Sequence, residues 1–238
     1  MSASIVAKSL CAGYGDLGVI SHMDFDLQPG GLMVLIGTNG SGKSTLLKTL
    51  AGLISPVDGE VFVLGAKPGT SPESVAYLPQ HPKSSGVLPL RARDIVSMGR
   101  YARQGLIGRQ SRVDADAVQR AMERTGVDAI ANRSLAEMSG GQQQRTHLAQ
   151  VLAREADVLL IDEPTAGLDA NGRESVKQIL REERDRGCAV VLATHDLEDA
   201  EDADVVMLLA HRVVAVGTPT EVLTDTNLRA CFGFTDRH

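Results

Sequence analysis

The sequence predicts an α/β protein whose mostly parallel sheet is covered by helices on both faces. Two observations indicate this fold class: short apolar strands alternate with helical segments, and a glycine-rich loop, residues 37–44, follows one such strand and opens a helix. Alternation of this kind favours parallel pairing, because each helical crossover returns the chain to the same edge of the sheet. The 238 residues, 43% of them hydrophobic, are enough to bury a substantial core.

Strands are expected where apolar runs end at turn residues. The expected strands are Ile5 to Leu10, Met23 to Leu27, Leu32 to Ile36, Glu60 to Leu64, Ser74 to Leu78, Val158 to Ile161, Ala189 to Thr194 and Val205 to Leu209. A helix should run from the glycine-rich loop to about Leu50. Between about residues 81 and 155 the pattern becomes helical, with a capping-box pattern at 111–114 before a helix over 115–125.

The composition of the chain disfavours several classes of partner and location. A net charge of −6 and 3% aromatic residues disfavour a nucleic-acid surface. No apolar run approaches the roughly 20 residues that span a bilayer, and the first residues lack the apolar segment of a signal peptide. The three cysteines, with no CxxC pair, are expected to be buried, reduced thiols in the cytosol.

Residues 37–44 form a P-loop, which binds the phosphates of a nucleoside triphosphate through backbone N–H groups and a helix N-terminus. We expect Lys43 to reach the β- and γ-phosphates and the Ser44 hydroxyl to bind Mg²⁺. The predicted nucleotide-binding residues here are Gly37, Thr38, Asn39, Gly40, Ser41, Gly42, Lys43, Ser44 and Thr45.

Polar residues follow two later apolar strands. Asp162 is expected to ligate Mg²⁺ or its bound water, and Glu163 to polarise the attacking water. His195 follows the strand that ends at Thr194, where parallel sheets bind ligands. The alternative for Asp162 and Glu163 is an ordinary strand exit before Pro164.

A second anion site is expected at the helix start formed by Ser139, Gly140, Gly141 and Gln142. Lys43 already serves the γ-phosphate within one chain. We therefore expect this second site to contact the nucleotide of a partner copy. A plain N-cap is the alternative, but it explains Ser139 without the two glycines, which weaken a helix.

Taken together, these motifs resemble the ATP-binding subunit of ABC transporters over essentially the whole chain. The resemblance implies a single ATP-hydrolysing domain, 1–238, that uses ATP and Mg²⁺. It implies a P-loop NTPase core with a mostly parallel sheet and a small antiparallel β subdomain, in 1–80 and 156–238, and an inserted helical subdomain in 81–155.

The resemblance also assigns roles to single residues. Tyr14 would stack on adenine, Gln80 would touch Mg²⁺ and sense the membrane subunit, and His195 would contact the γ-phosphate. Residues 138–142 resemble the signature motif, with Met138 where Leu is commoner. Residues 166–169 resemble the D-loop, although the first two differ from its usual form and only Asp169 carries over.

The implied partners are a second copy of the chain, integral-membrane permease subunits and, indirectly, a substrate-binding protein. The implied location is peripheral, on the cytoplasmic face of the cell membrane. Residues 96–101, 103–106 and 227–233 are similar to importers of zinc or manganese and to iron-chelate importers. The alternative is that they are packing residues, and an exporter or a non-transport ATPase also stays open.

Overall fold

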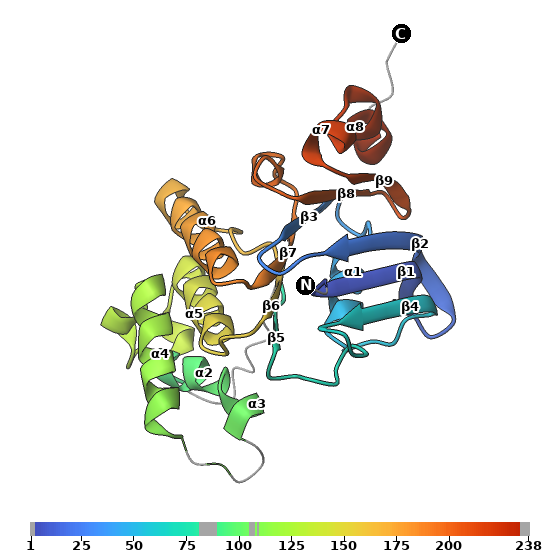
Figure 1. Ribbon diagram of the computed structural model, residues 1–238. Coiled ribbons are helices and arrows are strands. Elements are labelled where there is room, and N and C mark those ends of the chain that lie inside the picture. The colour runs from blue at the N-terminus through green and yellow to red at the C-terminus, as the bar shows by residue number, and fades with distance from the viewer. Residues whose placement is uncertain (1–2, 81–89, 105–107, 109, 234–238) are drawn as a thin grey trace.

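The computed structural model describes residues 3–80, 90–104, 108 and 110–233. The beginning of the expected helical insertion (81–89) and part of the 103–106 stretch lie outside these residues. Figure 1 shows two sheets side by side, with a group of helices on one side of the larger sheet.

The larger sheet has the strand order β5-β6-β7-β3-β8-β9, and every neighbouring pair except β8–β9 is parallel. Its strands are β3 (Leu32–Gly37), β5 (Val75–Leu78), β6 (Val158–Asp162), β7 (Ala189–Thr194), β8 (Val205–Leu209) and β9 (Val213–Gly217). Four of them are buried along nearly their whole length, as expected for parallel strands covered on both faces. The predicted fold class is confirmed.

The smaller sheet is antiparallel, with the order β2-β1-β4. Its strands are β1 (Ile5–Tyr14), β2 (Leu17–Leu27) and β4 (Asp58–Val63). Helix α1 (Lys43–Leu50) contacts both sheets, and its apolar side chains Leu46, Leu47 and Leu50 are fully buried.

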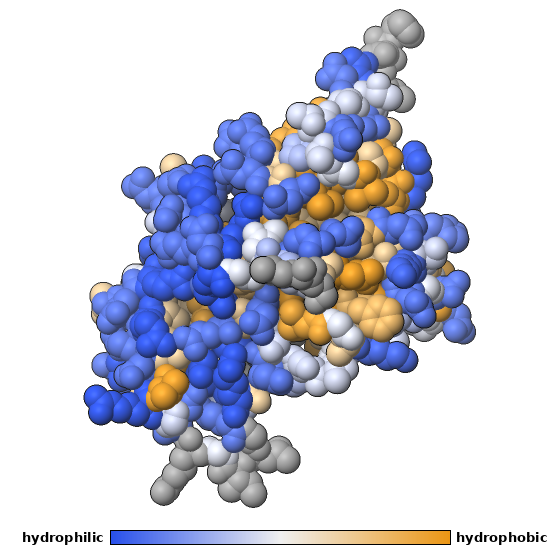
Figure 2. Space-filling model, viewed as in Figure 1, coloured by the Kyte–Doolittle hydropathy of each residue, from blue (hydrophilic) through white to orange (hydrophobic). Residues whose placement is uncertain are grey.

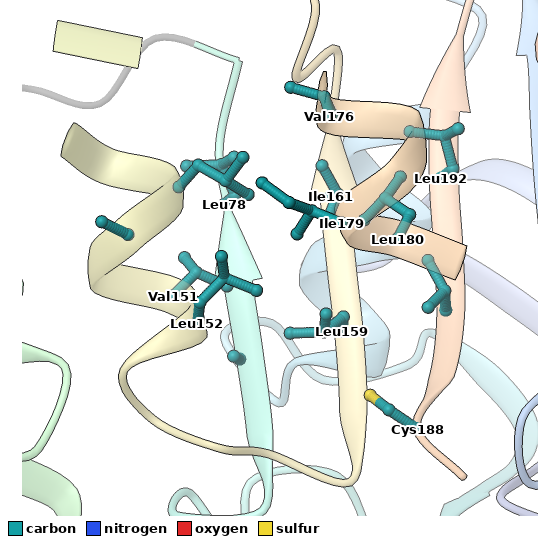
Figure 3. Close-up of a cluster of buried hydrophobic side chains, with 14 of the residues drawn as sticks. Leu78, Val151, Leu152, Leu159, Ile161, Val176, Ile179, Leu180, Cys188 and Leu192 are labelled. Carbon is teal, nitrogen blue, oxygen red and sulfur yellow. The ribbon is translucent and has the colours of Figure 1, made fainter. Parts of the chain in front are cut away.

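The other face of the larger sheet is covered by α5 (Gly140–Leu152) and α6 (Ala170–Asp185). Figure 3 shows Val151 and Leu152 of α5 beside Leu78 of β5, and Ile179 of α6 over β6 and Leu192 of β7. The strand β6 alternates between the two faces, because Leu159 and Ile161 belong to this cluster whereas Val158 and Leu160 pack on the α1 side.

The remaining helices lie at two ends of the molecule (Figure 1). One group comprises α2 (Ala92–Met98), α3 (Tyr101–Gln104) and α4 (Arg112–Thr125). Of these, α2 and α4 pack against each other and against α5. The other comprises α7 (Pro219–Val222) and α8 (Asp225–Phe232), beside β8 and β9. Figure 2 shows hydrophilic residues over the α4–α6 side and hydrophobic residues gathered over β8 and β9.

Three expectations about the elements are corrected. Strand β1 continues beyond Leu10 to Tyr14, and β2 begins at Leu17 rather than Met23. Strand β9 has no counterpart among the expected strands. Its turn from β8 contains His211 at φ +57°, a conformation usually signalled by Gly or Asn, so the sequence carries no hairpin signal. All three cysteines are free and buried, as expected.

Arg100, which directly follows the end of α2 at Gly99, connects three helical segments through one buried guanidinium. Its Nε atom lies 2.8 Å from Asp114 Oδ1 in the first turn of α4. Its Nη1 atom lies 3.1 Å from Glu155 Oε2 and donates to the Ala153 carbonyl at 3.0 Å, just beyond α5. Arg100 and Val96 are therefore packing residues of this helical group, as the structural alternative for 96–101 proposes.

Replacing Arg100 by Met should lower the free energy of unfolding by about 3–5 kcal/mol, because it leaves the buried Asp114 carboxylate without its cation. Urea unfolding at neutral pH measures the change. Arg112→Met, at an exposed arginine two residues before Asp114, is the matched control and should stay within about 0.5 kcal/mol of the wild type. Equal losses for both variants would contradict the central role of Arg100.

The carboxyl of Asp114 should make stability dependent on acid. A hydrogen bond from the Ser111 backbone N–H, helped by Arg100 and opposed by burial, lowers the pKa of Asp114 from 3.8 to about 2. A lowered folded-state pKa stabilises the fold above about pH 4, and this stabilisation is lost as the pH falls towards about 2. The stability difference between wild type and Asp114→Asn should therefore shrink over that window. Asp116→Asn, exposed on the same helix, is the control; a difference that stays constant with pH would contradict the assignment.

Candidate functional site

The strand order brings four sequence-distant segments to one edge of the larger sheet. Neighbouring strands β5, β6, β7 and β3 are parallel, so their carboxyl ends lie together. A cleft of about 160 Å³ opens there. It is lined by Asn39, Gly40, Ser41, Gly42, Lys43, Ser44, Thr45, Gln80, Asp162 and Glu163. The predicted P-loop thus lies together with three other predicted residues: Gln80, which follows β5, and Asp162 and Glu163, at the end of β6.

The P-loop has the backbone conformation that its glycines predict. Gly42, the N-cap of α1, has φ +108°, which an L side chain rarely adopts. A Cβ atom at this position would also lie 2.5 Å from the side chain of Ile20 in β2. The close approach of the small sheet therefore requires glycine at the start of the helix.

Lys43 is buried and lines this cleft. Its Nζ atom donates to the carbonyl oxygens of Gly37, at 2.6 Å, and Thr38, at 3.1 Å. Burial lowers the pKa of Lys43, while the nearby carboxylates of Glu163 and Asp162 raise it. The ammonium is thus largely desolvated, which strengthens its attraction for any anion that enters the loop.

Two features of the loop fit a nucleoside triphosphate with Mg²⁺. The buried Ser41 Oγ has no hydrogen-bond partner among the described residues, so it can bond to a ligand that enters the P-loop. The Ser44 hydroxyl lies near enough to Asp162 to lower the pKa of that carboxyl. A hydroxyl and a carboxylate side by side are the hard oxygen donors that Mg²⁺ prefers.

Neighbouring groups act on the pKa of Asp162 in both directions. Burial raises the pKa of this carboxyl and the charge of Glu163 raises it further, whereas the Ser44 hydroxyl, Lys43 and Lys48 lower it. A dication beside the carboxylate would favour its charged form in the same way as the lysines do.

Glu163 lies close to side chains that follow both neighbouring strands, β5 and β7. Gln80 Nε2 donates to its Oε2 atom at 2.9 Å, and His195 Nδ1 lies 3.6 Å from its Oε1 atom. The backbone of Glu163 is left-handed, with φ +48°, and its N–H donates to the Ala193 carbonyl. Non-glycine residues held in this region cluster at functional sites.

Tyr14 ends β1 with its ring half exposed, at 49% of the residue's surface. Its hydroxyl accepts a hydrogen bond of 3.4 Å from Lys48 Nζ on α1. An accessible aromatic face beside the P-loop helix is suited to stacking on a planar base, as predicted for adenine.

The start of α5 does not belong to the cleft that surrounds the P-loop. Ser139 Oγ accepts from the Gln142 N–H, and Gln142 Oε1 accepts from the Ser139 N–H, which forms a capping box. The contact of residues 139–142 with a partner's nucleotide stays a prediction. The plain N-cap interpretation explains the hydrogen bonds of Ser139. It leaves Gly140 unexplained, because a Cβ atom there would meet nothing within 4 Å in its own chain.

Asp169 caps α6, where its Oδ1 atom accepts from the Gly172 N–H at 2.8 Å. The preceding residue, Leu168, approaches the position of a Cβ on Gly141 to 3.3 Å. The predicted D-loop and signature motif therefore adjoin each other, although neither lines the cleft.

One residue near the site was missed by sequence reasoning. Gln144 is buried in α5, and its Nε2 atom donates to the carbonyl of Pro164, the residue after Glu163, at 3.2 Å. The sequence does contain a signal for this residue. Gln144 lies four residues before Leu148 and seven before Val151, so a polar side chain occupies the apolar face of the helix.

Comparisons with known proteins agree with this geometry. The model of the ABC transporter family matches residues 20–166. The manganese transport system ATP-binding protein MntB of Bacillus subtilis is 34% identical over 94% of this chain and 90% of its own length. The zinc transport system ATP-binding protein TroB of Treponema pallidum is 34% identical over 97% and 87%.

A solved structure assigned to a metal-chelate type ABC transporter, in an inward-facing conformation, has a TM-score of 0.84. It is 27% identical and covers 98% of this chain and 90% of its own. The extent of these matches confirms the resemblance expected from the sequence. The chain belongs to the ABC transporter family, as an ATP-binding ATPase of that family.

Proposed function

We propose that this chain is the ATP-hydrolysing subunit of an ABC importer for a metal ion, zinc or manganese. The observation that supports the ATPase mechanism most directly is the position of Glu163 beside the P-loop cleft, in contact with Gln80 and close to His195. The metal cargo rests on relatives whose names give manganese and zinc transport.

In this mechanism the side chains of the site bind the phosphates, activate the attacking water and hold Mg²⁺. Lys43, Ser41 and the N-terminus of α1 bind the phosphates of ATP. Glu163 orients the attacking water and accepts its proton, and His195 binds the γ-phosphate. Mg²⁺ would be held by Ser44, Asp162 and Gln80, and would neutralise charge on the phosphates.

The motif at the start of α5, residues 139–142, would bind ATP if two copies of the chain formed a dimer around two ATP molecules. The start of α5 has two N-terminal glycines, one of them open to solvent on its own chain, and lies outside the chain's own cleft. A partner's γ-phosphate would fit this helix N-terminus. Tyr14 would stack on adenine in the chain's own site, and Asp169 would fix α6 beside the interface.

The chain would act at the cytoplasmic face of a membrane, with integral-membrane permease subunits and, indirectly, a substrate-binding protein. No helix in the part of the chain that the structure describes is long and apolar enough to cross a membrane. Within those residues no group of three or more His, Cys, Asp or Glu is arranged to hold a metal ion. The cargo would accordingly be recognised by the other subunits. An iron-chelate importer, an exporter and a non-transport ABC ATPase are the alternatives.

The dimer is tested by combining two substitutions. Glu163→Gln should slow ATP hydrolysis by about 10²–10⁴-fold while ATP still binds, so that ATP with Mg²⁺ produces a dimer in sedimentation velocity. Adding Gly140→Arg should abolish the dimer, because the arginine would occupy the partner's phosphate position without meeting its own chain. Val113→Arg, exposed in the first turn of α4, is the matched control and should dimerise normally. A dimer that persists with Gly140→Arg would exclude the start of α5 from the interface.

Transport is tested in cells grown under metal limitation. Cells that carry Glu163→Gln in place of the wild type should accumulate less of one metal, because the importer cannot turn over. Elemental analysis of zinc, manganese and iron would identify the cargo by the single metal that falls. A rise in one metal would instead indicate export, and unchanged levels of all three would refute a metal-importing role while leaving the ATPase assignment intact.

A further inference from the structure

The imidazole of His195 is not oriented by packing. Its side chain is 72% exposed, and its contact with the site is the 3.6 Å approach of Nδ1 to Glu163 Oε1. A side chain this exposed is placed chiefly by its backbone. The residues that fix the turn after β7 therefore determine where the ring lies.

Both neighbours of His195 are held by hydrogen bonds. The buried Thr194 donates from Oγ1 to Asp199 Oδ2 at 2.8 Å, and the same Oγ1 accepts from the Asp196 N–H at 3.1 Å. Asp196 Oδ1 in turn accepts from the Glu198 N–H at 3.0 Å. The hydroxyl of Thr194 thus links the strand end before His195 to the residue after it.

Asp199 connects this turn to α6. Its side chain is only 6% exposed, and its second oxygen, Oδ1, lies 3.3 Å from Lys177 Nζ on α6. A carboxylate buried to this degree needs a cation and hydrogen-bond donors, which Lys177 and Thr194 supply. Helix α6 packs against β7 and begins at the cap residue Asp169. One chain of contacts therefore runs from α6 to His195.

We infer that Asp199 and Thr194 are positioning residues for His195, which keep its imidazole over Glu163 and make its position depend on α6. This inference rests on the proposed role of His195 in ATP hydrolysis. Neither residue lines the cleft around the P-loop. They act through the backbone of the turn.

Thr194→Val tests the inference, because it removes the hydroxyl and keeps a β-branched side chain of similar size. We expect kcat for ATP hydrolysis to fall at least tenfold, since small displacements of a reacting group cost large factors in rate. The affinity for ATP should change less than twofold, and Thr194→Ser should restore kcat. Thr125→Val is the matched control: Thr125 is also buried and also bonds through Oγ1, to the Ala121 carbonyl at 2.9 Å, but lies in α4.

A double-mutant cycle with His195→Ala separates positioning from general structural damage. In a His195→Ala background, Thr194→Val should cause no further loss in single-turnover phosphate release, because the group it positions is absent. A further loss as large as in the wild-type background would overturn the inference. If Thr194→Val does not fold, Asp199→Asn replaces it: this variant keeps an oxygen for Thr194, loses the charge that faces Lys177, and should lower kcat with unchanged ATP affinity.

The two proposals fail in different ways. Wild-type turnover in His195→Ala would refute the role of His195 itself. Impaired turnover in His195→Ala together with normal turnover in Thr194→Val and Asp199→Asn would refute the positioning role alone.

Discussion

The burial of helix α1 between the two sheets is the constraint on which the nucleotide site depends. Its leucines are inaccessible to solvent, and Gly42 at its start lies against Ile20 of the small sheet. The direction of the helix axis is therefore fixed, and so is the direction in which its N-terminal N–H groups point. The small sheet thus takes part in the site without contributing a side chain to the cleft.

Around this fixed helix, the order of the parallel strands determines which chemistry is possible. Glu163 lies beside Gln80 and His195 because β5, β6 and β7 are neighbouring parallel strands, and Asp162 lies near Ser44 because the carboxyl end of β3 is at the same edge of the sheet. Desolvation then acts in opposite directions on the two kinds of charge: it lowers the pKa of Lys43 and raises that of Asp162. Each group gains from an oppositely charged ligand, which favours a phosphate with a bound dication over either alone.

Local patterns were sufficient for the parallel sheet, the P-loop and the strand exits at Asp162 and His195, because their signals lie within a few consecutive residues. Local patterns failed where a residue other than glycine or asparagine has a left-handed backbone conformation, or where strand pairing is irregular. Strand β9 was missed because the turn before it contains His211 in place of glycine. The first part of β2 was missed because shifts in strand pairing near His22 interrupt the alternation of apolar and polar residues. The contacts of Gln144 and Asp199 depend on segments 20 and 22 residues away, Pro164 and Lys177, so no local pattern contains them. The structure describes where the site residues lie, and the chemical roles assigned to all of them stay predictions.

The hydrogen bond from Gln144 to Pro164 would have a kinetic consequence in a dimer. It joins the helix that starts at Ser139 to the residue after Glu163 within one chain. In a dimer of the proposed kind, these two segments serve different ATP molecules. When α5 contacts one ATP, the hydrogen bond would change the position of the Glu163 carboxylate that acts on the other ATP. The two hydrolysis events would therefore be coupled. The rate of ATP hydrolysis would then depend sigmoidally, not hyperbolically, on ATP concentration.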